Sequence, residues 1–131
     1  MTDPTNHQPS TAPDDRTRDV FVVERPWGHF QQFATNEPVT VKVLTINPGQ
    51  RLSLQHHAAR HEMWQVLDHP VEITLGERTW QAQPGDLVWV PVGTPHRMGN
   101  TGEQTARLLE LAFGDFDEDD ITRVQDDYRR D

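Results

Sequence analysis

The sequence predicts an all-β domain of short strands arranged as a sandwich or barrel. From Thr40 to Phe113, short apolar stretches recur at small intervals, and Pro, Gly and Asn residues separate them. Regularly spaced short strands with turn residues between them are typical of β-sandwiches and β-barrels. We count about nine strands, close to the eight of a double-sheet jelly roll. The length of 131 residues suits a single domain with a modest core.

The N-terminal residues 1–19 are expected to form a disordered tail. Three prolines lie there among Ser, Thr, Asp and Asn residues, a composition that buries too little apolar surface to offset the entropy lost on ordering. The folded domain is predicted over residues 20–131. Its first strand, residues 20–24, is stopped by an Arg-Pro pair, and a second strand follows the turn at Gly28 and continues through Phe33.

Seven further strands are predicted in the middle of the chain. Pro-Gly and other Gly-containing turns separate them, and Gly76-Glu77 is a compact hairpin turn. The predicted strands span residues 41–46, 52–57, 62–67, 71–75, 78–81, 87–90 and 106–113.

A short helix from about residue 117 is expected to end the chain. Ile121, Val124 and Tyr128 recur at three- and four-residue steps, which places them on one helical face. Carboxylates lie before this stretch, and Arg129 and Arg130 lie after it, which is the charge order that the helix dipole favours.

Composition excludes several classes of function. The formal net charge is −9, so the surface would repel phosphate backbones and a nucleic-acid partner is not expected. The chain has no cysteine, and a metal would therefore be held by His, carboxylate or amide groups. The N-terminus lacks the features of a secretory signal, and no apolar run reaches the length of a membrane span. We therefore expect a cytoplasmic protein without a membrane partner.

The candidate metal ligands lie between residues 49 and 100. Alternation along a strand places Gln55 and His57 on one face, and a hairpin brings Glu62 of the next strand beside His57. His96 follows a tight turn that can return it to the same place. Two imidazoles and one carboxylate on one face suit a divalent ion, and Gln55 can add an oxygen.

The other histidines of this region are left out of the site. His56 alternates to the opposite face of its strand, while His61 and His69 lie in or near loops. A single His or Glu in a strand is more often a surface residue or a satisfied polar group than a ligand. The predicted metal site therefore depends on the spacing of all four residues together.

Two motifs in this region resemble those of the cupins. The first cupin motif is a Gly, a His-x-His pair, a Glu and a final Gly at fixed spacing. Its spacing is kept here by Gly49, Gln55, His57 and Glu62, with His69 at the final position. The second motif is matched at every position by Gly85, Pro91, Gly93, His96 and Asn100. The resemblance implies the cupin double-stranded β-helix, a jelly-roll barrel, with a four-residue metal site.

Within the cupins, the sequence resembles the C-terminal domain of type II phosphomannose isomerases, bifunctional enzymes that also carry mannose-1-phosphate guanylyltransferase activity. The likeness runs from Arg25 to about Arg130. In that family Gln replaces the first His of the motif, as Gln55 does here. The matching segments are RPWG at 25–28, VKVLTINPGQRLSLQ at 41–55, GTPHRMGN at 93–100 and EDDITRVQDDYRR at 118–130. The resemblance implies the isomerisation of mannose 6-phosphate to fructose 6-phosphate.

Such an aldose-ketose isomerisation moves a proton between two neighbouring sugar carbons, so it needs a Lewis acid on the sugar oxygens and a positioned base. The resemblance implies a divalent zinc, manganese, cobalt, nickel or iron ion at the four predicted ligands. Arg60 aligns with the family's catalytic arginine, and its fixed charge suits an enediolate or a phosphate. Lys42 and Glu110 are the other catalytic candidates, and the identity of the base stays open. For each, an ordinary ion pair or a solvated side chain is the alternative.

The sequence also departs from the family. Met63 stands where the family usually has a His, alanines at 58 and 59 replace further His residues, and Ala112 replaces a Gln. These departures predict a less basic pocket. Because only a 19-residue tail precedes the domain, guanylyltransferase activity is not expected.

Two other functions remain open. One is a catalytically silent cupin that binds a sugar or small acid. The other is a non-haem metal dioxygenase that uses His57, Glu62 and His96. The expected partners are a small-molecule sugar phosphate and a second copy of the chain, because cupins are commonly homodimers and the strand at 20–24 can pair across an interface.

Overall fold

Two facing antiparallel sheets form the body of the protein in this computed structural model, which describes residues 14–128. The first sheet contains, in order, β3 (Val39–Ile46), β10 (Ala106–Gly114), β5 (Arg60–Val66) and β8 (Leu87–Val90). The second contains β11 (Thr122–Gln125), β4 (Leu54–His56), β9 (His96–Gly99), β6 (Val71–Leu75) and β7 (Arg78–Ala82). The strands of residues 14–128 do not join these two sheets into one closed barrel. The all-β prediction is confirmed.

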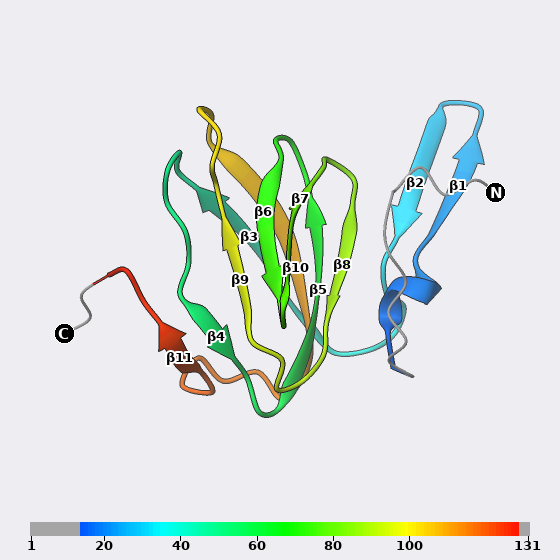
Figure 1. Ribbon diagram of the computed structural model, residues 1–131. Helices are drawn as coiled ribbons and strands as arrows, with labels where there is room; N and C mark the ends of the chain where they lie inside the picture. Colours follow the sequence, from blue (N-terminus) through cyan, green and yellow to red (C-terminus); the bar gives the residue numbers. More distant parts are fainter. Residues whose placement is uncertain (1–13, 129–131) are drawn as a thin grey trace.

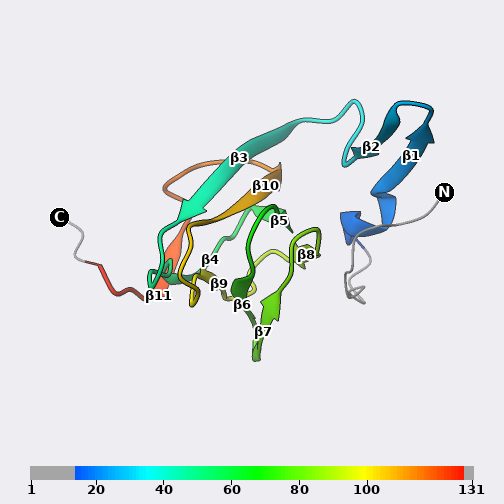
Figure 2. The same ribbon diagram turned by 90° about the horizontal axis from the view of Figure 1, so that it is seen from above.

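The N-terminal elements lie beside this sandwich. A 3-10 turn, η1 (Arg16–Asp19), leads into a hairpin of β1 (Phe21–Arg25) and β2 (Gly28–Gln32). Figures 1 and 2 show the hairpin standing apart from the two sheets. No helix within residues 14–128 has the length and apolarity needed to cross a membrane.

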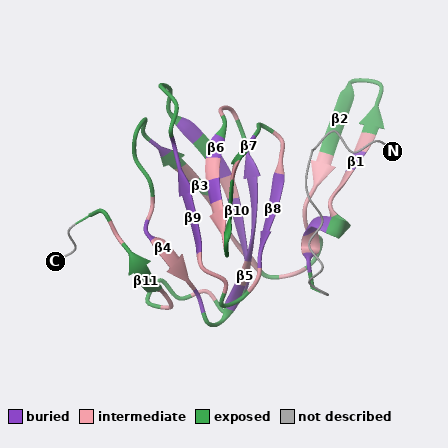
Figure 3. Ribbon diagram, viewed as in Figure 1, coloured by how far each residue is buried: buried purple, intermediate pink, exposed green. Residues whose placement is uncertain are grey.

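Strand alternation produces an apolar cluster on each face of the first sheet. Between the sheets, Trp64, Ile73, Met98 and Leu108 are among the buried residues of the larger cluster. The outer face carries the smaller cluster, and residues around η1 and the hairpin cover it. Its buried members are Met63, Leu87, Trp89, Leu111 and Phe113. Figure 3 shows this burial along β5, β8, β9 and β10.

The predicted disordered tail is wrong for residues 14–19. Asp15 caps η1 by accepting a hydrogen bond from Thr17 N at 2.8 Å, and both residues are buried. Arg16 donates to Glu37 at 2.7 Å, which ties the turn to the segment before β3. These local bonds and the adjacent apolar cluster order this part of the tail, while residues 1–13 lie outside the described residues.

The predicted C-terminal helix is also wrong within the described residues. Residues 122–125 form strand β11, which pairs with β4. Before it, Asp120 N donates to Asp117 O and Asp119 N donates to the Asp117 carboxylate, so the acidic run forms turns. Aspartate side chains compete with helical hydrogen bonds in this way. Hydrogen bonding to a neighbouring strand has therefore overridden the helical spacing of the apolar residues.

Candidate metal centre

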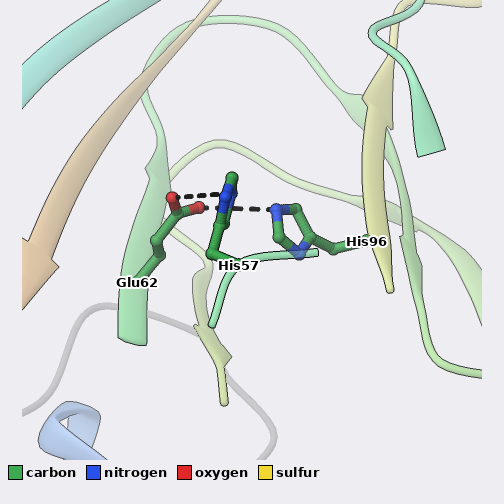
Figure 4. Close-up of side chains that lie close together, drawn as sticks. All are labelled: His57, Glu62 and His96. Carbon is green, nitrogen blue, oxygen red and sulfur yellow. Dashed lines mark ion pairs between the residues drawn. The ribbon is translucent and has the colours of Figure 1, made fainter. Parts of the chain in front are cut away.

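Glu62 of β5 is the centre of a buried polar group at one end of the sandwich. Its Oε2 lies 3.3 Å from His57 Nε2, and its Oε1 lies 3.7 Å from His96 Nε2. One ligand atom from each of the three residues lies within 4.8 Å of the others. Figure 4 shows the three side chains pointing toward one another. The structure thus brings together three of the four predicted metal ligands.

Backbone carbonyls orient both imidazoles. His57 Nδ1 lies 2.7 Å from Asp120 O, and His96 Nδ1 lies 2.9 Å from Thr94 O. A carbonyl can only accept, so each Nδ1 carries the proton and each Nε2 of the neutral ring offers a lone pair. This second hydrogen bond is the usual way in which proteins orient a metal-binding histidine.

Electrostatics prepares the same group for a cation. Burial would raise the pKa of Glu62, but His96, His57 and a hydrogen bond from Arg60 together hold it below its usual value. Burial lowers the pKa of His96 against the opposing effect of the Glu62 charge. The arrangement favours an anionic carboxylate beside a neutral His96 imidazole, which are the protonation states that bind a metal.

The donor set fits a divalent ion. His96 Nε2 is buried and has no hydrogen-bond partner among the described residues. Ligand atoms bound to one ion at about 2.1 Å lie roughly 3 to 3.5 Å apart, so modest side-chain movement would bring these three atoms to coordinating positions. Two imidazoles and a carboxylate suit zinc and several other divalent transition metals.

Arg60 is the nearest cation to this group. It is 6% exposed, and its Nε donates to Glu62 Oε2 at 3.1 Å. Its Nη2 lies 3.3 Å from His57 Nε2, so it donates to the lone pair that an ion would use. Metal binding would therefore require a small withdrawal of this guanidinium from His57.

A cavity of about 210 Å³ adjoins the metal-ligand group. Gln55 lines it beside His96, its partner across β4 and β9, and Gln55 Oε1 accepts a hydrogen bond from Ser53. Lys42 and Glu110 also line it, as the sequence predicted. All predicted site residues except His57 thus line one cavity. His57 contacts Glu62, which is one of the lining residues.

Glu110 differs from the other carboxylates of the cavity. It is buried on β10 and hydrogen-bonded to Glu62. Burial, together with the nearby charge of Glu62 and their shared hydrogen bond, raises the pKa of Glu110 to about 8 from 4.5. This shift favours the protonated form of Glu110 in the metal-free protein. Lys42 is less enclosed, and its Nζ lies 2.5 Å from Glu118 Oε1 at the cavity rim.

Asp120 is a site residue that the sequence interpretation missed. Its carboxylate accepts hydrogen bonds from Ala58 N at 2.8 Å and Ala59 N at 2.9 Å, while its carbonyl orients His57. From its sequence, the acidic run is interpreted as the start of a helix. The match of this run to the family sequence was the signal that could have pointed to Asp120. The segment containing Asp120 leaves β10 at Gly114, whose Cβ, if present, would lie 2.6 Å from Ala59 O.

The predicted effect of Met63 on the pocket is wrong. Met63 is fully buried in the outer apolar cluster and faces away from the cavity. Ala58 and Ala59 are exposed and bonded to Asp120 through their backbone. Only Ala112, on the same β10 face as Glu110, lies on the inner side of the sheet.

The excluded histidines lie elsewhere. His61 is on β5 rather than in a loop, and it contacts Asp14 at 2.8 Å and stacks on Trp89 of the outer cluster. His69 lies 3.6 Å from Asp68. Neither is among the cavity-lining residues.

Comparison with known proteins gives a consistent family match. Residues 13–126 match the family model described as mannose-6-phosphate isomerase C-terminal. The xanthan biosynthesis protein XanB of Xanthomonas campestris is 37% identical over 109 residues, which are 82% of this chain and 23% of that protein. Mannose-1-phosphate guanylyltransferase 2 of Escherichia coli O157:H7 is 35% identical over 113 residues, 86% of this chain and 23% of that protein. The chain thus spans about a quarter of the length of these relatives.

Solved structures share the fold at lower identity. A putative sugar phosphate isomerase from Acidithiobacillus ferrooxidans has a TM-score of 0.55 and 23% identity, covering 60% of this chain and 51% of that one. A Klebsiella pneumoniae protein with a double-stranded β-helix domain has a TM-score of 0.56 and 20% identity, covering 60% and 70% respectively. The predicted double-stranded β-helix architecture is confirmed by this likeness.

Proposed function

Because the chain belongs to the mannose-6-phosphate isomerase C-terminal family, we propose that it is a metal-dependent isomerase that interconverts mannose 6-phosphate and fructose 6-phosphate. The observation that carries this proposal is the convergence of His57, Glu62 and His96 beside a cavity that also contains Arg60. Guanylyl transfer, which is named for the relatives, is not part of the proposal.

The metal-ligand group and Arg60 would act on the same part of the sugar. A divalent ion held by His57, Glu62 and His96, with Gln55 as a proposed fourth ligand, would supply a Lewis acid for the sugar oxygens. Arginine side chains carry a fixed positive charge, and Arg60 is shielded from solvent. Its guanidinium can therefore stabilise negative charge that develops on a sugar oxygen during proton transfer.

Glu110 is our candidate for the proton-transfer group. Its carboxyl lines the cavity and is hydrogen-bonded to Glu62, so it is held next to the residues that orient the sugar oxygens. An ionised carboxylate in this position can take a proton from one carbon and return it to the neighbouring one. A divalent ion held by Glu62 would offset the charge that raises the pKa of Glu110 and would so favour this ionised form. Lys42 would balance charge at the rim, where it now pairs with Glu118.

A coupled assay with mannose 6-phosphate tests the proposal. The metal-free protein is loaded in turn with zinc, manganese, cobalt, nickel or iron(II), and fructose 6-phosphate is measured. We expect turnover with at least one metal and at least a 100-fold lower kcat for Arg60→Gln, because a fixed charge is lost from the reacting region. Arg107→Gln, which removes an exposed arginine paired with Asp68, is the control. Absence of turnover with every metal would reject the isomerase.

The same samples address the alternative functions. Oxygen consumption by the iron(II) form would support a dioxygenase that uses the same three ligands. Tight binding of mannose 6-phosphate without turnover would support a silent binding protein.

A further inference from the structure

Several cationic side chains line the cavity. The chain has 12 Lys and Arg residues and a net charge of −9. Four of these 12 residues line the cavity: Lys42, Arg60, Arg97 and Arg123. Three carboxylates, Glu62, Glu110 and Glu118, line the same cavity, so the cation that can receive a negatively charged group is the one that its protein partners hold least tightly.

Three of the four cations have close protein partners. Arg60 contacts the metal-ligand group. Arg97 is buried and donates to Gln125 Oε1 at 3.0 Å and to the backbone carbonyl of Leu52, just before β4. Lys42 is paired with Glu118. An incoming anion would have to displace a partner from each of these three residues.

Arg123 is held more loosely. Its side chain is 37% exposed, and its Nε lies 4.0 Å from Asp126 Oδ2. That distance is too long for a hydrogen bond. The planar guanidinium of Arg123 can therefore offer two parallel N–H groups to an anion without giving up a short bond to Asp126.

The position of Arg123 in the sheet directs it toward the metal-ligand group. Arg123 of β11 pairs with Gln55 of β4, and Gln55 pairs with His96 of β9. Opposed residues of neighbouring strands share a face, so the three side chains form one row on the cavity side. Adjacent strands lie about 4.8 Å apart, which separates the backbones of Arg123 and His96 by roughly 10 Å. This span is comparable with the length of a six-carbon sugar phosphate.

We propose that Arg123 binds the phosphate group of the sugar phosphate and thereby selects phosphorylated sugars. The proposal rests on the proposed function, since it places the sugar oxygens at His57, Glu62 and His96. The irregular register of β11 directly after Arg123 supports this role, because β-bulges often re-aim side chains next to functional sites.

Calorimetric titration of the manganese-loaded full chain tests this role. The probes are mannose 6-phosphate, mannose and inorganic phosphate. We expect Arg123→Gln to weaken mannose 6-phosphate and inorganic phosphate binding at least tenfold and to leave mannose binding unchanged. Arg123→Lys should retain part of the affinity, because it keeps the charge and loses the bidentate geometry. The control is Arg78→Gln on β7, which makes the same charge change outside the cavity.

The possible outcomes separate this proposal from the isomerase. Native-like binding of mannose 6-phosphate by Arg123→Gln, or an equal loss of mannose binding, would overturn the role of Arg123. So would failure of the native chain to prefer mannose 6-phosphate over mannose. An Arg123-dependent preference in a protein without turnover would reject the isomerase and support the phosphate site.

Discussion

The space between the two sheets has an apolar end and a polar end, and the same strands build both. On β5 the inward-facing row changes from Glu62 at one end to Val66 at the other, and on β10 it changes from Glu110 to Leu108. On β9, His96 belongs to the metal-ligand group, while the inward-facing Met98 belongs to the core. The strand frame is therefore common to both ends, and the side chains alone decide which end packs and which end binds.

The apolar end of the space between the sheets stabilises the fold, and the polar end carries the reactive groups. Burial of apolar side chains stabilises the fold, whereas buried charges cost free energy unless they are paired. The polar end accepts that cost with Glu62, Arg60 and two imidazoles at close range. Trp64 lies at the boundary, because its ring belongs to the core and its Nε1 donates to Glu62 Oε1 at 3.1 Å. Substitutions at the two ends should consequently change different quantities.

Truncation in the apolar end should have the largest effect on stability. Leu108 is fully buried, and Leu108→Ala should lower the free energy of unfolding by about 2 to 5 kcal/mol because it leaves a cavity. Urea denaturation measures this loss. The metal affinity of the folded variant should match that of the native protein, and a large change in affinity would show that the two ends are not independent.

Removing the charge of the central carboxylate should remove most of the stabilisation that metal binding provides. At a metal concentration 100 times the Kd, the native protein should gain about 2.7 kcal/mol. Glu62→Gln should lose most of this gain because an anionic ligand is replaced by a neutral amide. Thermal melts with and without metal measure it, with the exposed Glu77→Gln as the charge-matched control. Equal metal-induced shifts in both variants would argue against the predicted ligand.

The raised pKa of Glu110 predicts a pH dependence of the metal-free protein. Between the usual value of 4.5 and the folded value of about 8, the folded state holds a proton that the unfolded state has released. This contribution to stability is thus fully present below pH 4.5 and declines by about 1.4 kcal/mol per pH unit up to about pH 8. Glu110→Gln should remove this slope. The free energies of unfolding of the native protein and the variant, measured by denaturation at pH 5.5, 6.5 and 7.5, give the difference. Parallel native and variant curves would contradict it.

A smaller effect is expected from the residue that orients His57. Asp120→Asn should weaken metal binding about tenfold, because an amide nitrogen cannot accept a bond from Ala58 N or Ala59 N and the carbonyl on His57 would shift. Competition with a metal-binding dye gives the affinity. Asp119→Asn, one residue earlier and exposed, is the matched control. Identical affinities would limit Asp120 to a role in folding.

Strand periodicity predicted much of the fold, and residue spacing together with the family resemblance predicted most of the site. Strands 71–75 and 87–90 were predicted with the observed bounds, because their apolar stretches end at clear turn residues. Alternation and one hairpin predicted that His57 and Glu62 meet, and the cupin resemblance added His96, which the structure brings to the same place.

Tertiary contacts explain what the sequence interpretation missed. No strand was predicted over His96–Gly99, and the pairing of this segment with β6 defines it as strand β9. β11 is likewise defined by β4 rather than by its own spacing. The positions of Met63 and Asp120 depend on which sheet face and which distant backbone they meet. The predicted homodimer and cytoplasmic location stay predictions.

Crystals grown with manganese offer the most direct test of the polar end. The account predicts a single strong anomalous peak within bonding distance of His57 Nε2, Glu62 and His96 Nε2, with Arg60 withdrawn from His57. A peak at other residues, or a map in which Arg60 still contacts His57 and no peak lies at these three ligands, would contradict it.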